Sequence, residues 1–297
     1  MLTTRTYQPG DEVQEVEFDC RIVADWPWPV AYTAEGLART ISSPSFDPTR
    51  FVYALDGDRL VGKAEIWFVR QLDEGYKSGY LLFPKTLPGY EMAREPLLDH
   101  VTRLLAEEGV DRIQIRGSTA WKGSIEWLRD HGYTTDPDQP QGYKKYLKYA
   151  LSKGPINVPT DNVIELDMDR DRDDIAHAAS VWMSCSHESA IKSVERLLGD
   201  EAPIAHLGVR ENGEIAGAVL VGKNWYRPTT AALFYAYARN PKALRQLAAG
   251  AIKACAQVGT TDLIVDVINA HRCFEPTYLD LGFVGVADHA MFERIIG

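Results

Sequence analysis

The sequence has few cysteines and no long apolar run. Its cysteines Cys20, Cys185, Cys255 and Cys273 are scattered, without a Cys-x-x-Cys pair or a flanking histidine, so we expect neither a metal site nor a disulfide framework. No apolar stretch approaches the roughly 18 residues of a membrane helix, and the start MLTTRTYQPGDEVQEVEF has no signal-peptide core. We therefore expect a cytoplasmic protein with no membrane partner.

Basic residues are also scarce. The 297 residues include 32 Lys and Arg against 42 Asp and Glu, which gives a net charge of −10. Binding to a nucleic-acid backbone needs clustered Lys and Arg, so we expect no nucleic-acid partner. A cationic or amine substrate is compatible with this charge.

The chain contains a repeated pattern. DGDRLVGKAEI (56–66) and ENGEIAGAVLV (211–221) both join an Asp-Gly or Asn-Gly turn to strand-forming residues, the signature of a β-hairpin. Three landmarks recur at offsets of 155, 157 and 150: Gly62 with Gly217, Pro84 with Pro241, and Gly132-Tyr133 with Gly282-Phe283. The spacing predicts a duplicated unit of about 150 residues.

Apolar periodicity predicts the same order of elements in each half. We expect strands in the first half at 2–7, 51–55, 59–69, 79–83, 111–117 and 143–151, and helices around 13–18, 96–108 and 124–131. In the second half we expect strands at 162–166, 203–210, 214–222, 229–238, 261–268 and 289–296, and helices at 173–183, 190–198 and 241–258 with a last one ending near 283. The linker candidate SKGPINVPT then gives domains at 1–151 and 161–297, with the linker at 152–160.

This order of elements resembles the GNAT superfamily of acyl-CoA-dependent N-acyltransferases, in both halves. The duplicated layout is similar to that of the mycothiol synthases, in which the C-terminal copy is active. The resemblance implies an α+β, three-layer fold in each half, with a mixed, mostly antiparallel sheet flanked by helices. It also implies acetyl-CoA as the acyl donor and direct transfer to an amine of a small molecule or peptide.

The resemblance places several functional residues in the second half. Tyr278, four residues before Gly282-Phe283, corresponds to the general acid that protonates the departing thiolate. Asn269 closes the strand at 261–268, where the family's Asn contacts the cofactor, although its spacing to Tyr278 is two residues longer than usual. Tyr237 and Ala238 end the strand whose backbone would face the pantetheine arm. For Tyr278 and Asn269, core packing and turn capping are alternative roles.

The phosphate-binding stretch allows two registers. In the first, Arg245, Ala248 and Gly250 take the places of the family's R-x-x-G-x-G pattern. In the second, Asn240 caps a helix that begins at Pro241, the phosphate meets the amides of Lys242 to Leu244, and Gly250 only packs the helix. The sequence does not separate these alternatives.

The first half departs from the family pattern. Its loop KTLPGYEMAREP keeps one glycine, Gly89, and Leu128 stands where the second half has Tyr278. We expect this copy to be inactive. In the same half, the stretch containing Trp26 and Trp28 could line a hydrophobic or cationic substrate pocket, or pack in the core between helices.

No general base stands out. Asp266, on the strand at 261–268, could have a raised pKa and accept a proton. His206, His187 and Glu188 are the other candidates, and each also has a structural explanation. We expect an N-acetyltransferase whose chemistry lies in the second half. The alternatives are a non-enzymatic acyl-CoA-binding or ligand-sensing protein, and a scaffold without a cofactor groove.

Overall fold

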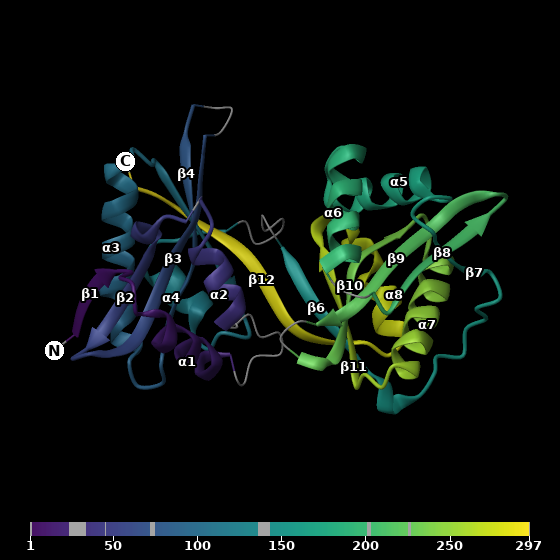
Figure 1. The fold of residues 1–297 in the computed structure, drawn as a ribbon, viewed down its shortest axis with the longest axis horizontal. Coiled ribbons are helices and arrows are strands. Elements are labelled where there is room, and N and C mark those ends of the chain that lie inside the picture. The colour runs from purple at the N-terminus through teal and green to yellow at the C-terminus, as the bar shows by residue number, and fades with distance from the viewer. Residues whose placement is uncertain are drawn as a thin grey trace. The chain divides into compact units, whose positions relative to one another are not determined.

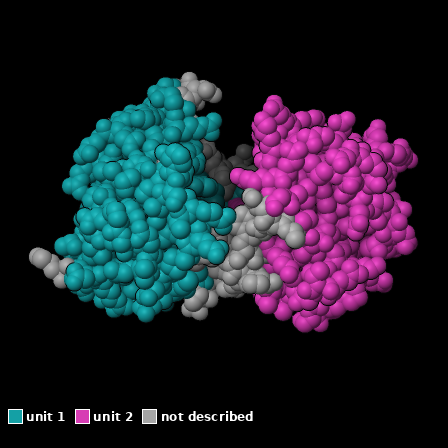
Figure 2. Space-filling model, viewed as in Figure 1, with its two compact units in different colours: residues 1–143, 288–297 teal, residues 144–287 magenta. Residues whose placement is uncertain are grey.

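The structure is a computed structural model. It describes residues 2–23, 34–44, 46–71, 75–135, 143–200, 203–224 and 227–296. The chain forms two compact units, coloured separately in Figure 2. Unit 1 consists of residues 1–143 and 288–297, and unit 2 consists of residues 144–287. Within the described residues, no helix is long and apolar enough to cross a membrane.

Unit 1 is a mixed sheet with helices (Figure 1). Its strands, in sheet order, are β1 (Leu2–Thr6), β2 (Phe51–Asp56), β3 (Arg59–Gln71), β4 (Lys77–Thr86), β5 (Arg112–Ser118) and the end of β12 (Val284–Ile295). Its helices are α1 (Glu12–Ile22), α2 (Ala34–Ile41), α3 (Arg94–Glu107) and α4 (Ser124–Asp130), with 3-10 turns η1 (Pro48–Arg50) and η2 (Glu91–Ala93). Only β4 and β5 pair in parallel among the described ladders of this unit.

Unit 2 repeats this order. Its strands, in sheet order, are β6 (Lys144–Ala150), β11 (Asp262–Ile268), β10 (Arg227–Ala238), β9 (Glu214–Asn224), β8 (Ala205–Glu211) and β7 (Val163–Glu165). Its helices are α5 (Arg172–Met183), α6 (His187–Asp200), α7 (Pro241–Gln257) and α8 (Glu275–Asp280), with 3-10 turns η3 (Leu151–Lys153) and η4 (Asn269–Phe274). The β10–β11 ladder is parallel and the others given for this unit are antiparallel. The predicted mixed, mostly antiparallel sheet with flanking helices is confirmed.

The last strand of each half is exchanged between the units. Strand β6 comes at the end of the first half of the sequence, yet it pairs along its whole length with β11 of unit 2. Strand β12 ends the second half, and residues 289–295 pair with β5 of unit 1. The sequence repeat suggests boundaries at 151 and 161, whereas the compact units change at 143 and 287. The stretch 152–160 therefore lies inside unit 2.

Helices α5 and α7 cover opposite faces of the unit 2 sheet. Tyr237 of β10 lies against His177 of α5, with ring centroids 5.5 Å apart. Gly217 of β9 pairs with Ala238 of β10 and lies beneath Leu247 of α7. Because consecutive side chains of a strand point to opposite faces, Tyr237 faces α5 and Ala238 faces α7.

Two of the three sequence landmarks mark equivalent places. A Cβ on Gly62 would meet Leu97 of α3, and a Cβ on Gly217 would meet Leu247 of α7. Both glycines therefore allow a helix to approach the sheet closely. Gly132 and Gly282 both have positive φ, 77° and 91°, and both end a helix.

The remaining landmark is wrong. Pro84 lies within β4, whereas Pro241 is the first residue of α7. Leu97 and Leu247 are 150 positions apart, so the residue equivalent to Pro241 is Glu91, which begins η2. An X-Pro pair favours an extended conformation before the proline, and Pro also suits the first helical position. Both uses look alike in sequence.

Candidate functional site

Strands β10 and β11 part at their carboxyl ends. Within the described residues, their parallel ladder runs from Thr230–Asp262 to Ala232–Ile264, while β10 continues to Ala238 and β11 to Ile268. The antiparallel ladder between β9 and β10 is irregular between Leu233 and Tyr235. A bulge of this kind turns a strand away from its neighbour. The backbone beyond it can bind an extended ligand as a neighbouring strand would.

Helix α7 begins directly after this parted region. The side chain of Asn240 accepts a hydrogen bond from the Ala243 amide at 2.8 Å, and Pro241 occupies the first helical position. Ala248 and Gly250 are buried in the third turn. A Cβ on Gly250 would lie 3.1 Å from Val163 and 3.2 Å from Leu207, so this glycine faces the edge strands of the sheet.

Basic side chains surround the start of α7. Arg239 is 2.7 Å from Glu214, Lys242 is 3.3 Å from Glu211, and Arg245 is 2.9 Å from Asp280. These pairs lie largely at the surface, where an ion pair contributes about 0–1 kcal/mol. An anion that offers more hydrogen bonds could therefore replace the carboxylates. The helix dipole adds positive potential at the same place.

Tyr278 lies on the opposite side of the sheet from α5, in the core beside α7. It is 3% exposed, and its ring centroid is 5.2 Å from that of Phe283. The Phe283 amide donates to the Tyr278 carbonyl at 3.1 Å, as the Tyr133 amide donates to the Leu128 carbonyl at 3.0 Å. Leu128 is thus the residue equivalent to Tyr278. Burial raises the pKa of the Tyr278 hydroxyl, which therefore keeps its proton at neutral pH.

Asp266 of β11 points to the face of the sheet opposite to the side that holds Tyr278. It pairs with Lys144 of the adjacent strand β6, and Asp262 and Lys148 form a similar pair at 3.6 Å on the same face. Burial acts to lower the pKa of Lys144, but Asp266 and Tyr146 together outweigh it and the pKa is raised. A carboxylate engaged with an ammonium group is a weak proton acceptor, so this pairing favours a structural role for Asp266. Asn269 begins η4, immediately after β11.

Two histidines lie along the α5 side of unit 2. His177 Nε2 is 3.4 Å from the Tyr237 hydroxyl, which also accepts a hydrogen bond from Arg239 Nε at 3.4 Å. The ring of His187, in the first turn of α6, is 6.1 Å from that of His177. These contacts connect the end of β10 with the α5–α6 surface.

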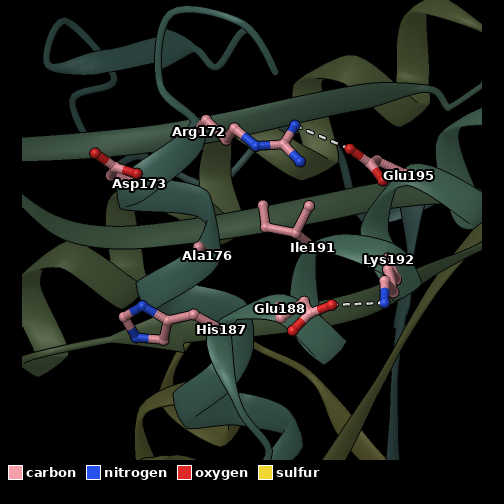
Figure 3. A pocket seen from close by; sticks show the side chains of 8 residues that line it. All are labelled: Arg172, Asp173, Ala176, His187, Glu188, Ile191, Lys192 and Glu195. Carbon is pink, nitrogen blue, oxygen red and sulfur yellow. Dashed lines mark hydrogen bonds and ion pairs between the residues drawn. The ribbon is translucent and has the colours of Figure 1, made fainter.

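A hollow of about 400 Å³ opens between α5 and α6. Figure 3 shows Arg172 reaching toward Glu195 and Lys192 toward Glu188, with Ile191 and Ala176 between the two pairs. His187 and Asp173 complete its lining. The hollow thus contains His187 and Glu188, two of the residues that the sequence offered as bases.

His206 is buried on the side of the sheet that faces α5. It shares a hydrogen bond with the Tyr235 hydroxyl, and burial lowers its pKa to about 4 against the opposing effect of Asp171. The ring is therefore neutral at pH 7. Its partner and its burial explain it as a core residue, which removes one candidate base.

The corresponding gap in unit 1 is bridged by aromatic side chains. Strands β4 and β5 also part, after the pair Leu81–Ile115. Phe83, beyond that point on β4, stacks on Trp121, which follows β5, with centroids 5.8 Å apart. Trp127 meets Phe83 edge to face at 5.6 Å. The stretch with Trp26 and Trp28 lies outside the described residues.

Sequence reasoning missed two residues of unit 2. His177 occurs in an alanine-rich helical stretch, and His271 follows Asn269 in a segment without periodicity. Neither has a motif around it. Alignment of the two halves at the Gly-aromatic turns could have identified His271, because the equivalent residue, 150 positions earlier, is Trp121.

The comparisons with known proteins agree with this architecture. No family model and no curated protein matches the sequence. A GCN5-related N-acetyltransferase from Sphaerobacter thermophilus is similar over 99% of this chain and 95% of its own, with a TM-score of 0.69 and 14% identity. A tandem GNAT protein from the clavulanic acid biosynthesis pathway is similar over 100% and 99%, with a TM-score of 0.67 and 14% identity.

A third solved structure extends this likeness. A GNAT-family acetyltransferase from Colwellia psychrerythraea is similar over 98% of this chain and 99% of its own, with a TM-score of 0.59 and 15% identity. At these identities the likeness concerns the fold. The chain therefore has the tandem GNAT fold along its whole length, as the order of elements in the sequence predicts.

Proposed function

We propose that unit 2 is an N-acetyltransferase that moves an acetyl group from acetyl-CoA directly to a primary amine of a small molecule or peptide. The parting of β10 and β11 beyond Ala232–Ile264 carries this proposal. Beyond that pair, within the described residues, the backbone of Leu233 to Ala238 has no ladder with β11. An extended pantetheine arm can form strand-like hydrogen bonds there.

The donor phosphates would lie at the first turn of α7. The Asn240 cap and the helical position of Gly250 support the second of the two sequence registers. We assign phosphate contacts to Arg239, Lys242 and Arg245, whose surface ion pairs can open. Tyr237 and Ala238 would contact the pantetheine arm through their backbone, and Asn269 would lie near the same arm. Ala248 and Gly250, in the third turn of α7, would pack this helix against its neighbours and would not contact the phosphates.

The acidic step is assigned to Tyr278. Attack of a neutral amine on the thioester carbon breaks the C–S bond and leaves a thiolate. Tyr278 keeps its proton at neutral pH because burial raises its pKa, so it can donate that proton to the sulfur. Tyr278 lies on the α7 side and the acceptor would approach from the α5 side. The two reactants would thus meet in the gap.

The first experiment measures acetyl-CoA binding by calorimetry and thiol release with benzylamine, glucosamine and spermidine. We expect one acetyl-CoA per chain, because Phe83 and Trp121 bridge the gap of unit 1. Binding of two molecules would contradict the inactive assignment of unit 1. Binding without turnover of any amine would instead indicate a ligand-sensing protein, and absence of binding would indicate a scaffold.

Tyr278→Phe tests the acid directly. We expect turnover to fall at least about tenfold, roughly 1.4 kcal/mol of transition-state stabilisation, with unchanged acetyl-CoA affinity. Tyr133→Phe is the matched control, because Tyr133 is buried in the equivalent turn of unit 1. We expect full turnover from it. If Tyr278→Phe lowers only the unfolding temperature, the tyrosine is a packing residue.

A further inference from the structure

His271 contains a buried ring nitrogen without a partner. The residue lies in η4, three positions beyond the end of β11, and is 7% exposed. Among the described residues, its Nε2 atom has no hydrogen-bond partner. Leaving such a group unpaired costs about 1–3 kcal/mol. A phenylalanine would avoid that cost, so packing alone does not explain the imidazole.

The ring of His271 is held in a fixed position. It stacks on Trp182 of α5, with centroids 4.4 Å apart and planes inclined by 19°. The same helix carries His177, which contacts Tyr237 at the end of β10. Helix α5 thus contacts the end of β10 through His177 and the segment after β11 through Trp182. Both contacts lie on the side from which the acceptor would approach.

The first copy shows what this position is like without a basic ring nitrogen, because the indole N–H of tryptophan donates a hydrogen bond and does not accept a proton. Trp121 is equivalent to His271, and it stacks on Phe83 across the parted strands. An aromatic ring therefore fits at this position of the fold. The copy with the bridged gap has an indole here, and the copy with Tyr278 has an imidazole.

We propose that His271 Nε2 accepts the proton of the acceptor amine during acetyl transfer in unit 2. The inference rests on the proposed function and adds the base that it lacks. The amine nitrogen bonds to the thioester carbon as the C–S bond breaks. Its proton passes to His271, and the Tyr278 proton passes to the sulfur. Transfer of a proton from His271 to Tyr278 through solvent restores both groups, so an amide and a free thiol are the net products.

The state of the ring is compatible with this role. Burial lowers the pKa of His271, so the imidazole is neutral at pH 7 and can accept a proton. His206 is also neutral, but its Nε2 is already engaged with Tyr235. Asp266 is engaged with Lys144. Among these three side chains, His271 is the one whose ring nitrogen is not engaged by any described residue.

His271→Phe tests the proposal, because phenylalanine keeps the stack on Trp182 and removes the nitrogen. With acetyl-CoA and the amine that wild type acetylates fastest among benzylamine, glucosamine and spermidine, we expect kcat to fall about 100-fold or more. The affinity for acetyl-CoA and the unfolding temperature should not fall. His100→Phe is the control, since His100 is a part-buried histidine of unit 1 bonded to Thr4, and its kcat should equal that of wild type.

The outcomes separate the two proposals. Wild-type turnover with an unchanged kcat in His271→Phe overturns the role of His271 and leaves the proposed function in place. A fall in kcat that accompanies equal losses of acetyl-CoA binding and unfolding temperature also overturns it, because the ring would then be structural. Absence of turnover in the wild type overturns both. His271→Gln, which keeps polarity but not basicity, should also lose kcat.

Discussion

The two units share a frame and differ where their parallel strands part. The helix-to-strand turns at Gly132 and Gly282 have the same hydrogen bonds, and Gly62 and Gly217 both admit a helix against the sheet. In unit 1 a stack of aromatic rings bridges the parted strands. In unit 2 the equivalent region has a tyrosine, Tyr278, and an imidazole, His271, whose Nε2 has no hydrogen-bond partner among the residues that the structure describes. The comparison shows that the two units share the residues that shape the frame and differ in the residues beside the parted strands.

The two units also differ in charge on one face of the sheet, the face against α1 in unit 1 and against α5 in unit 2. In unit 1 Lys63 pairs with Glu15 and lies 3.6 Å from both Asp19 and Glu65, all nearly inaccessible to solvent. Lys85 lies 3.6 Å from Asp19. The residue of unit 2 equivalent to Lys63, 155 positions later, is Ala218, which faces α5. The same architecture thus accepts a buried lysine with its carboxylates in one copy and an alanine at the equivalent position in the other.

Lys63→Met should have the largest effect on stability, and it should destabilise unit 1 only. It leaves three buried carboxylates without their central cation, which should lower the free energy of unfolding by about 3–5 kcal/mol. Urea denaturation measures the loss, and hydrogen exchange should locate it in β2 and β3. Lys192→Met removes an exposed pair and should cost about 0–1 kcal/mol. Equal losses in the two variants would mean that the cluster contributes little.

Acid should destabilise unit 2 through His206. The pKa of His206 in the folded state, about 4, lies below its unfolded value of 6.5. Folding therefore favours the neutral form of the ring. This stability is complete above pH 6.5 and is lost as pH falls from 6.5 toward 4, by about 3 kcal/mol. The equivalent residue of unit 1 is Phe51. His206→Phe should therefore flatten the pH dependence of unit 2 unfolding between pH 7 and 4. A curve as steep as that of wild type would place the effect elsewhere.

Two glycine variants should have the smallest effect on stability. They test whether Gly62 and Gly217 have the same role in the two units. A Cβ on Gly217 would lie 2.7 Å from Leu247 and 3.0 Å from the Tyr237 carbonyl, whereas a Cβ on Gly62 would lie 3.0 Å from Leu97. We expect Gly217→Ala to cost about 1–3 kcal/mol and Gly62→Ala to cost less.

Only Gly217→Ala should also weaken acetyl-CoA binding, because it displaces the end of β10. Calorimetry on both variants checks this difference. If both weaken binding equally, donor binding is not confined to unit 2.

Much of the fold could be predicted from the sequence. The helix predicted at 241–258 is α7 at Pro241–Gln257, and the strand predicted at 261–268 is β11 at Asp262–Ile268. Local periodicity and capping specify such elements. The landmark Pro84–Pro241 failed because proline is tolerated both at a strand irregularity, where Pro84 lies, and in a first helical turn. The exchange of β6 and β12 had no local signal, since a strand reads the same whichever neighbour it pairs with.

The candidate site was predicted less fully than the fold. Tyr278 and Asn269 were predicted from the resemblance to the GNAT superfamily, and Tyr278 lies in the turn equivalent to that of Leu128 in unit 1. Ala248 and Gly250 look like part of a glycine pattern, but both are buried in the third turn of a helix that begins at Pro241, and Gly250 faces the edge strands. His177 and His271 went unnoticed because their significance depends on contacts with Tyr237 and Trp182, which are 60 and 89 positions away in sequence.

The duplication, the order of helices and strands and the Gly-aromatic turns follow from the sequence alone, because they depend on periodicity and on backbone conformations that few residues adopt. The strand that closes each sheet, the pairing of charges and the lack of a partner for His271 Nε2 among the described residues follow only from tertiary structure. Those properties depend on atoms brought together from distant parts of the chain, and burial then sets what a missing partner costs.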